Sequence, residues 1–187
     1  MKKDTHRKNI EFKETQLRHK EFAGITFADC SFIDCEFTET LLSDCVFERC
    51  NFNMVHFAQT RLNGVVFHNC KLTGTDFSDC NDLLMTVRFE QCLLDYASLS
   101  RKNFSQTMFN TCSIKDVEFS ETNLTGAIFT DCNLEHTIFQ RANLTETDFR
   151  TAQNYSINLD ANFLKKTRFS LSGLPGLLER YDIEIDL

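Results

Sequence analysis

The chain has 187 residues, enough for one domain, and contains 19 Phe, no Trp, one Pro and only six Gly. A β-sandwich or barrel of this length would need more Gly and Pro at its turns, and the net charge of −7 argues against direct nucleic-acid binding, which needs a basic face. No apolar run is long enough to span a membrane, and no apolar stretch follows the basic residues at the N-terminus. We therefore expect a cytoplasmic protein with no signal peptide.

From residue 10 onward, the chain repeats every five residues. Stepping by five from Phe12 to Phe77 meets Phe or Leu at every position. After a two-residue slip at 80–85, the series resumes at Leu84 and runs to Phe169 with one failure. Helices repeat every 3.6 residues and strands every two. The pattern instead predicts a solenoid, in which each pentad forms one side of a square coil and its Phe or Leu points inward.

A second series, two residues before each inward residue, holds small or β-branched side chains that suit tight interior corners. The nine cysteines fall in it, and six recur every 20 or 22 residues: Cys30, Cys50, Cys70, Cys92, Cys112 and Cys132. With twenty residues per coil, these six are predicted to stack as buried thiols. Disulfides and zinc are weaker alternatives, because the sulfurs would lie side by side in a linear stack. Lys20 and Lys102 break the series, which predicts corners open to solvent.

The sequence holds no motif typical of an enzyme. It lacks a glycine-rich phosphate loop, Gly-x-Ser-x-Gly and His-Glu-x-x-His. Its five His residues fall on different sides of the predicted coil, without a common acidic or nucleophilic partner. We expect a noncatalytic protein with no cofactor and no metal site.

One side of the predicted coil, centred on the series from Leu17 to Leu159, is acidic. It carries seven acids against three arginines, a balance of −4, and we call it the acidic wall; the acids are Glu36, Glu39, Asp76, Asp79, Glu118, Glu121 and Asp160. Carboxylates on about every second coil would recur roughly every 10 Å. Such a wall would attract a protein surface built to hold DNA. The alternative is that the acids only keep a flat-sided rod soluble.

After Phe169 the pattern changes. Pro175 suits the first turn of a helix, and one apolar stripe follows at helical spacing: Leu174, Leu177, Leu178 and Tyr181. Ile183, Ile185 and Leu187 then alternate with acids, as in a strand. Residues 171–187 either cap the last coil or, with the stripe and Ile183 as the interface, join two copies into a homodimer.

Individual pentads resemble the motif of the pentapeptide-repeat family: a small residue, Asp or Asn, Leu or Phe, and two polar residues. Examples are Thr75-Asp76-Phe77-Ser78-Asp79, Thr122-Asn123-Leu124-Thr125-Gly126 and Ala142-Asn143-Leu144-Thr145-Glu146. The resemblance covers residues 10–170 and leaves 1–9 as an N-terminal extension. It implies an all-β solenoid, a right-handed quadrilateral β-helix of about eight coils, here followed by a short helix and a terminal strand.

The run Leu177-Leu178-Glu179-Arg180-Tyr181-Asp182-Ile183 resembles the closing segment of the Qnr and MfpA group of that family. This resemblance implies a homodimer that mimics double-stranded DNA and binds DNA gyrase or topoisomerase IV. It also implies that the chain modulates the enzyme or protects it from quinolones or toxins. The alternative is a repeat scaffold that binds another cytoplasmic protein. At the end of the repeats, both Phe163 and Leu164 fit the inward position.

Overall fold

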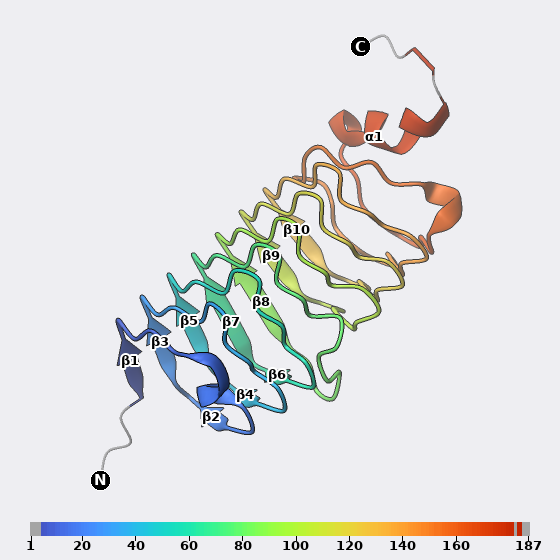
Figure 1. Cartoon of the computed structure of the whole chain (residues 1–187). Helices are drawn as coiled ribbons and strands as arrows, with labels where there is room; N and C mark the ends of the chain where they lie inside the picture. The colour runs from blue at the N-terminus through green and yellow to red at the C-terminus, as the bar shows by residue number, and fades with distance from the viewer. Residues whose placement is uncertain (1–4, 182, 185–187) are drawn as a thin grey trace.

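The computed structural model describes residues 5–181 and 183–184, which form a β-solenoid of stacked coils with a helical segment at the C-terminal end (Figure 1). The strands are β1 His6–Lys8, β2 Glu21–Ala23, β3 Thr26–Ala28, β4 Leu41–Ser43, β5 Val46–Glu48, β6 Arg61–Asn63, β7 Val65–His68, β8 Val87–Glu90, β9 Met108–Asn110 and β10 Ile128–Thr130. The one α-helix in the described residues is α1 Pro175–Leu178, and the 3-10 helices are η1 Glu14–Leu17, η2 Leu159–Ala161, η3 Leu171–Gly173 and η4 Glu179–Tyr181.

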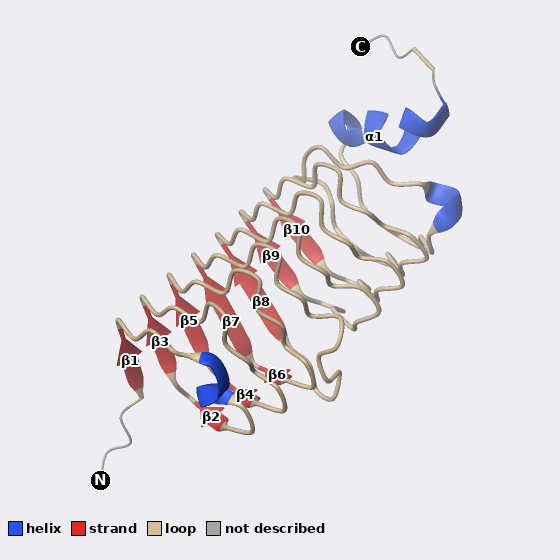
Figure 2. Ribbon diagram, in the orientation of Figure 1, coloured by secondary structure: helices blue, strands red, loops and turns tan. Residues whose placement is uncertain are grey.

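Parallel pairing between successive coils holds the solenoid together. One side is a seven-stranded sheet in the order β1-β3-β5-β7-β8-β9-β10, and a second side is formed by β2-β4-β6 (Figure 2). The seven strands mark about six turns, fewer than the eight coils expected from the repeats. The count is lower because pairing beyond β10 consists of isolated bridges, such as Ile128↔Asp148 and Asp148↔Arg168.

The coil length is visible in the strand register. Phe27 pairs with Phe47 and Phe47 with Phe67, so each coil takes twenty residues. Phe67 pairs with Phe89 across the slip, where the coil takes twenty-two. The paired rings stack within the solenoid, as for Phe27 and Phe47, whose centroids lie 4.9 Å apart. Rings from adjacent sides meet edge to face, which is the favourable geometry for close aromatic pairs. The predicted inward column of Phe and Leu is confirmed over most of the chain.

The interior corners are closed by small side chains that also donate hydrogen bonds. Thr60 Oγ1 donates to the carbonyl of Phe37 at 2.7 Å, and Cys70 Sγ donates to the carbonyl of Phe47 at 3.3 Å. In both cases the acceptor lies 23 residues earlier, on the preceding coil. All nine cysteines are buried free thiols. The backbone nitrogen of Cys50 lies 3.4 Å from Cys70 Sγ, which confirms the predicted stacking.

The slip at 80–85 differs from the prediction. Leu84 is 70% exposed, so its predicted inward position is wrong, and Met85 is buried instead. The backbone nitrogen of Leu83 donates to Asn81 Oδ1 at 2.9 Å, a local turn that directs the chain outward before Met85. The expectation for Lys102 is also wrong. Its side chain is only 12% exposed, because its ammonium donates to the carbonyl of Cys80 and pairs with the Asp82 carboxylate.

The last coil departs from the five-residue period as well. Leu159 lies half-exposed in η2, whereas Tyr155 and Ile157 are buried, so the predicted inward position of Leu159 is wrong. The departure arises because the chain closes here with a helical turn instead of a flat side. At the next position, Leu164 packs against the core while Phe163 is 68% exposed, which resolves the two alternatives in favour of Leu164.

Each end of the solenoid has its own cap. The region predicted as an N-terminal extension contributes β1, in which Arg7 pairs with Phe27 and lies over the rings of Phe22 and Phe27. At the other end, η3, α1 and η4 follow one another, and Leu177 is buried. The predicted terminal strand falls largely outside the described residues, and Ile183 and Glu184 are in no strand. No helix in the described part of the chain is long and apolar enough to cross a membrane.

Candidate protein-binding surface

The structure places three residues of the acidic wall in one column along a side of the solenoid. Glu36, Asp76 and Glu118 belong to one parallel ladder of bridges, in which His56 separates the first two and Ser98 the last two. Because adjacent bridged residues lie about 4.8 Å apart, the three predicted carboxylates are spaced on alternate coils. This arrangement follows directly from the twenty-residue coil.

A second column of predicted residues follows the corner of the same side. The backbone nitrogen of Glu39 donates to the carbonyl of Ala58, and that of Gln59 to the carbonyl of Asp79. Glu121 continues the column beyond Arg101, whose nitrogen donates to the carbonyl of Ser120. Several corner residues, including Glu39 and Glu121, have positive φ. Their side chains therefore leave the solenoid at its edge, where they are exposed.

Arginines neutralise two of these carboxylates, Glu36 and Glu121. Arg18 lies 3.1 Å from Glu36, and Arg141 pairs with Glu121. Two histidines also face carboxylates one coil away: His19 lies 3.2 Å from Glu39, and His56 lies 3.5 Å from Asp76. Among the described residues, Asp79 and Glu118 are the two predicted wall acids outside η2 that form no ion pair. The carboxylates of these two residues therefore face neither a cation nor an imidazole within ion-pair distance in the described part of the chain.

Asp160 is placed differently from the other six predicted acids. It lies in η2, where its backbone nitrogen is capped by Asn158 Oδ1 at 3.0 Å. Its carboxylate lies 2.9 Å from Arg180 Nη1, and Arg180 also donates to Asn158. Asp160 therefore links the last coil to η4.

The histidine pairs are a feature that the sequence analysis missed. Outside the wall, His68 lies 3.5 Å from Glu90 and His136 lies 3.4 Å from Asp116. The histidines share no common partner, but four of them each face a carboxylate on a neighbouring coil. The twenty-residue spacing was the available signal, since adding one coil to His19 or His56 gives an acid.

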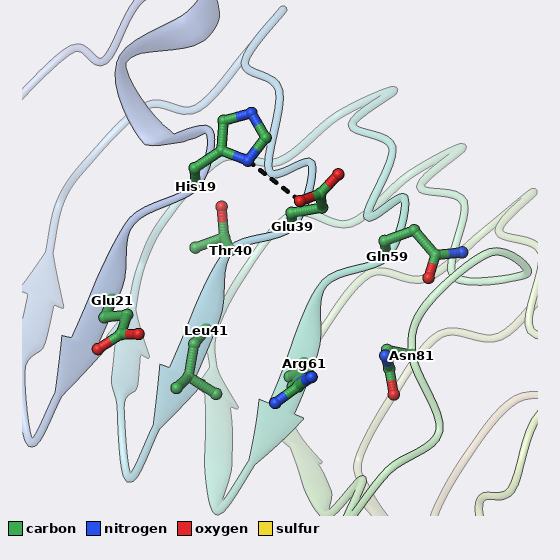
Figure 3. A pocket seen from close by; sticks show the side chains of 8 residues that line it. All are labelled: His19, Glu21, Glu39, Thr40, Leu41, Gln59, Arg61 and Asn81. Carbon is green, nitrogen blue, oxygen red and sulfur yellow. Dashed lines mark ion pairs between the residues drawn. The ribbon is translucent and has the colours of Figure 1, made fainter.

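A groove runs along the corner between the acidic wall and the β2-β4-β6 side (Figure 3). Its volume is about 460 Å³, and it is lined by His19, Glu21, Glu39, Thr40, Leu41, Gln59, Arg61 and Asn81. The His19–Glu39 pair lies at one part of the groove, with Arg61 and the amides of Gln59 and Asn81 farther along. This lining suits hydrogen bonding to a polar partner. No group of three or more His, Cys, Asp or Glu residues within 5–181 and 183–184 is arranged to hold a metal ion.

The predicted dimer residues are unevenly exposed. Leu177 is buried, Leu178 is half-buried, and Leu174, Tyr181 and Ile183 are exposed. The neighbouring Leu171 is also exposed, which the sequence analysis did not single out. The structure thus divides the predicted stripe between contacts within the cap and an apolar outer surface.

Comparison with known families gives the class of the protein. The pentapeptide repeat region model matches residues 40–117, and the pentapeptide repeats (8 copies) model matches residues 118–152. Together these matches cover more than half of the chain, which therefore belongs to the pentapeptide-repeat family. The model of the SV2A/B/C luminal domain also matches residues 1–77. A search of curated proteins by sequence finds no significant match.

Solved structures show a Qnr-like fold. Full-length QnrB1, a plasmid-mediated fluoroquinolone resistance protein, aligns with a TM-score of 0.66 at 17% identity, covering 95% of this chain and 97% of that one. A trypsin-treated variant of QnrB1 aligns with a TM-score of 0.64 at 18% identity, covering 97% of both chains. At such low identity the likeness establishes the fold alone.

Proposed function

We propose that the chain is a noncatalytic mimic of double-stranded DNA that binds DNA gyrase or topoisomerase IV and modulates or protects it. The observation that carries the proposal is the acidic wall, in which carboxylates recur on alternate coils along one side of the solenoid. The similarity in fold to a fluoroquinolone resistance protein supports the same partner. The proposed site of action is the bacterial cytoplasm, where the topoisomerase works.

The charge of the wall is sparser than that of DNA. Duplex DNA carries one negative charge per about 1.7 Å of axis, whereas the ladder places an acid on alternate coils, roughly every 10 Å. The ion pairs of Glu36 with Arg18 and of Glu121 with Arg141 lower the effective charge of the wall further. Recognition would therefore combine steering by Asp79 and Glu118 with the elongated shape, instead of reproducing every phosphate.

We also propose a homodimer formed by the C-terminal segment, with Leu174, Leu177, Leu178, Tyr181 and Ile183 at its interface. The exposed apolar side chains around α1 and η4 support this, since contiguous apolar surface is typical of interaction sites. Two solenoids joined at these ends would present two acidic walls along one particle of about 80 Å.

The test uses the two wall acids that have no ion-pair partner in the described part of the chain. The double variant Asp79→Lys/Glu118→Lys is expected to bind gyrase more weakly than the unmodified chain. The concentration of protein needed to inhibit DNA supercoiling should rise at least about tenfold. The matched control is Asp131→Lys with Glu146→Lys, because both residues are exposed acids on other sides of the solenoid. Equal loss in both double variants, or no loss in either, would count against the acidic wall as the docking surface.

A second function is favoured by the same ion pairs. The ion pairs of Glu36 and Glu121 with arginines are also what the exposed side of a scaffold would show, where charges serve only solubility. As a scaffold for another cytoplasmic protein, the chain would leave supercoiling by purified gyrase unchanged, with or without a fluoroquinolone. The supercoiling assay with the unmodified chain separates the two functions.

A further inference from the structure

An exposed apolar strip borders the acidic wall on the corner opposite the groove. Met54, Gly74 and Tyr96 follow one another on successive coils, because the nitrogen of Met54 bonds the carbonyl of Thr73 and the nitrogen of Gly74 bonds the carbonyl of Asp95. We call these three residues the apolar ridge. Each lies two residues before a member of the wall ladder, which continues as His56, Asp76 and Ser98. The ridge is therefore the edge of the wall itself.

The side chains of the ridge are unusually exposed for their type. Met54 is 66% exposed and Tyr96 is 67% exposed. The same corner carries Asp34 before them and Asp116 after them, both with positive φ. An apolar pair thus interrupts an otherwise polar edge near the middle of the solenoid. Exposed Tyr and Met are enriched at the centres of protein interfaces, where a ring of polar residues surrounds them.

Neighbouring residues position the Met54 side chain and the turn that carries Tyr96. A Cβ atom at Gly74 would overlap Met54 Sδ, so the thioether lies across the glycine toward the next coil. On the Tyr96 side, the Asp95 carboxylate accepts hydrogen bonds from Ser113 Oγ at 2.6 Å and from the nitrogen of Lys115 at 3.0 Å. These bonds fix the turn that carries Tyr96. A preorganised anchor loses less conformational entropy on binding than a mobile one.

We propose that the apolar ridge is the anchoring contact of the docking surface, and that Met54 and Tyr96 enter an apolar pocket of the partner. Carboxylates border the ridge on the acidic wall and along the corner. The complementary rim of the partner's pocket therefore carries basic residues. The partner is thus a protein surface that combines cations for a DNA backbone with one apolar depression. This inference rests on the proposed function and adds a contact that DNA mimicry alone does not require.

The ridge and the carboxylates contribute to binding in different ways. Exposed charges are screened by salt, so removing wall acids lowers the salt dependence of the affinity. Removing a buried apolar contact lowers the affinity at every salt concentration and leaves its salt dependence unchanged. The two sets of residues can therefore be distinguished in one titration series.

The experiment measures the affinity of the full chain for purified gyrase subunits between 50 and 300 mM NaCl. Tyr96→Ser and Met54→Ser are each expected to weaken binding about tenfold, which is typical for an interface anchor, without changing the salt slope. Tyr96→Phe keeps the ring and is expected to stay within about threefold of the unmodified chain. The matched control is Met108→Ser, an exposed methionine of β9 in the seven-stranded sheet. Thermal unfolding of every variant checks the fold.

Three results would overturn the inference, and they are distinguishable. If the unmodified chain binds but Tyr96→Ser and Met54→Ser bind as well as Met108→Ser, the ridge is no anchor and the proposed function stands. If the unmodified chain binds no gyrase subunit at any salt concentration, the proposed function fails and the ridge proposal fails with it. A loss of affinity confined to high salt would also contradict an apolar contact.

Discussion

Arg7 occupies in β1 the position that Phe27 occupies in β3, and its guanidinium carbon lies 5.8 Å from the centroid of the Phe27 ring. The cation covers the end of the aromatic column while its polar edge stays in water. Arg7→Ala is expected to lower the free energy of unfolding by about 1 kcal/mol, measured by urea denaturation. Lys8→Ala is the control and should change little, because Lys8 is exposed and lies 3.8 Å from Asp29.

Cys70 offers a test of the interior corners. Its thiol donates to the carbonyl of Phe47, the role that Thr60 fills for Phe37. Cys70→Thr is therefore expected to preserve thermal stability, whereas Cys70→Ala leaves a carbonyl without this donor and costs about 1 kcal/mol in the free energy of unfolding. Chemical denaturation of the two variants checks this order. A more stable Cys70→Ala would show that the hydrogen bond contributes nothing.

The thiols are also expected to be unreactive in the folded chain. Burial raises the pKa of the Cys35 thiol to about 11, with Asp34 adding to the effect, and burial raises the pKa of Cys70 as well. Little thiolate then forms at these two sites near neutral pH. Hydrogen bonds with Cys132 and Cys92 instead lower the pKa of the Cys112 thiol, so its protection depends on burial, which denies the reagent access to the sulfur. Alkylation followed by mass spectrometry should label the cysteines at the rate of unfolding and no faster. Rapid labelling of an internal cysteine in native buffer would refute the expectation.

The folded chain is expected to lose stability at low pH as the carboxylate of Asp148 is protonated. Hydrogen bonds from the Arg150 guanidinium, with Nη2 2.7 Å from Oδ2, hold the pKa of Asp148 below its usual range, although burial opposes the shift. Since the folded pKa is lowered, the stabilisation is complete above the unfolded value of about 3.9 and is lost as the pH falls below it. Arg150→Gln should therefore reduce the drop in melting temperature between pH 6 and pH 3. Arg101→Gln, which removes an exposed arginine that forms no ion pair with the described residues, should leave that drop unchanged.

The C-terminal cap depends on two close approaches to Tyr155. A Cβ atom at Gly176 would overlap the carbonyl oxygen of Tyr155, and one at Gly173 would overlap its hydroxyl. Gly176→Ala must displace backbone, so it is expected to detach α1 from the last coil and lower the melting temperature by several degrees. Ser156→Ala, at an exposed position next to Tyr155, tests whether the effect is specific to the close approach. If the cap also forms the dimer, light scattering of Gly176→Ala should show a monomer.

The core of the solenoid could be predicted from the sequence because a Phe or Leu every five residues suits few other structures. The same period also placed Glu36, Asp76 and Glu118 on one side. It failed where neighbouring residues are all apolar, as at Leu83, Leu84 and Met85. There, the turn made by the Asn81 side chain decides which residue is buried, and hydrophobicity alone does not.

Other differences arise from long side chains and from the ends. The sequence gives no reason for Lys102 to be buried, because its partners are a backbone carbonyl and a carboxylate brought near by the slip. Arg7 breaks the Phe and Leu series, so the first strand was missed. The arginine–carboxylate and histidine–carboxylate pairs of the acidic wall depend on the direction of side chains across coils. The sequence alone does not show these pairs, although three of the four join residues that are twenty positions apart.

The twenty-residue coil has a consequence for how such a chain can change in length. Deleting four pentads would remove one layer and leave Glu118 aligned with Glu36. Deleting a single pentad between them would turn everything downstream by a quarter revolution, so that Glu118 and Glu121 would face a different direction from Glu36 and Glu39. The two extra residues near Leu84 avoid this because they bulge outward and Phe67 still pairs with Phe89. Gene duplications and deletions that keep the partner-facing side intact are therefore restricted to whole layers, or to small bulges that preserve the angular phase.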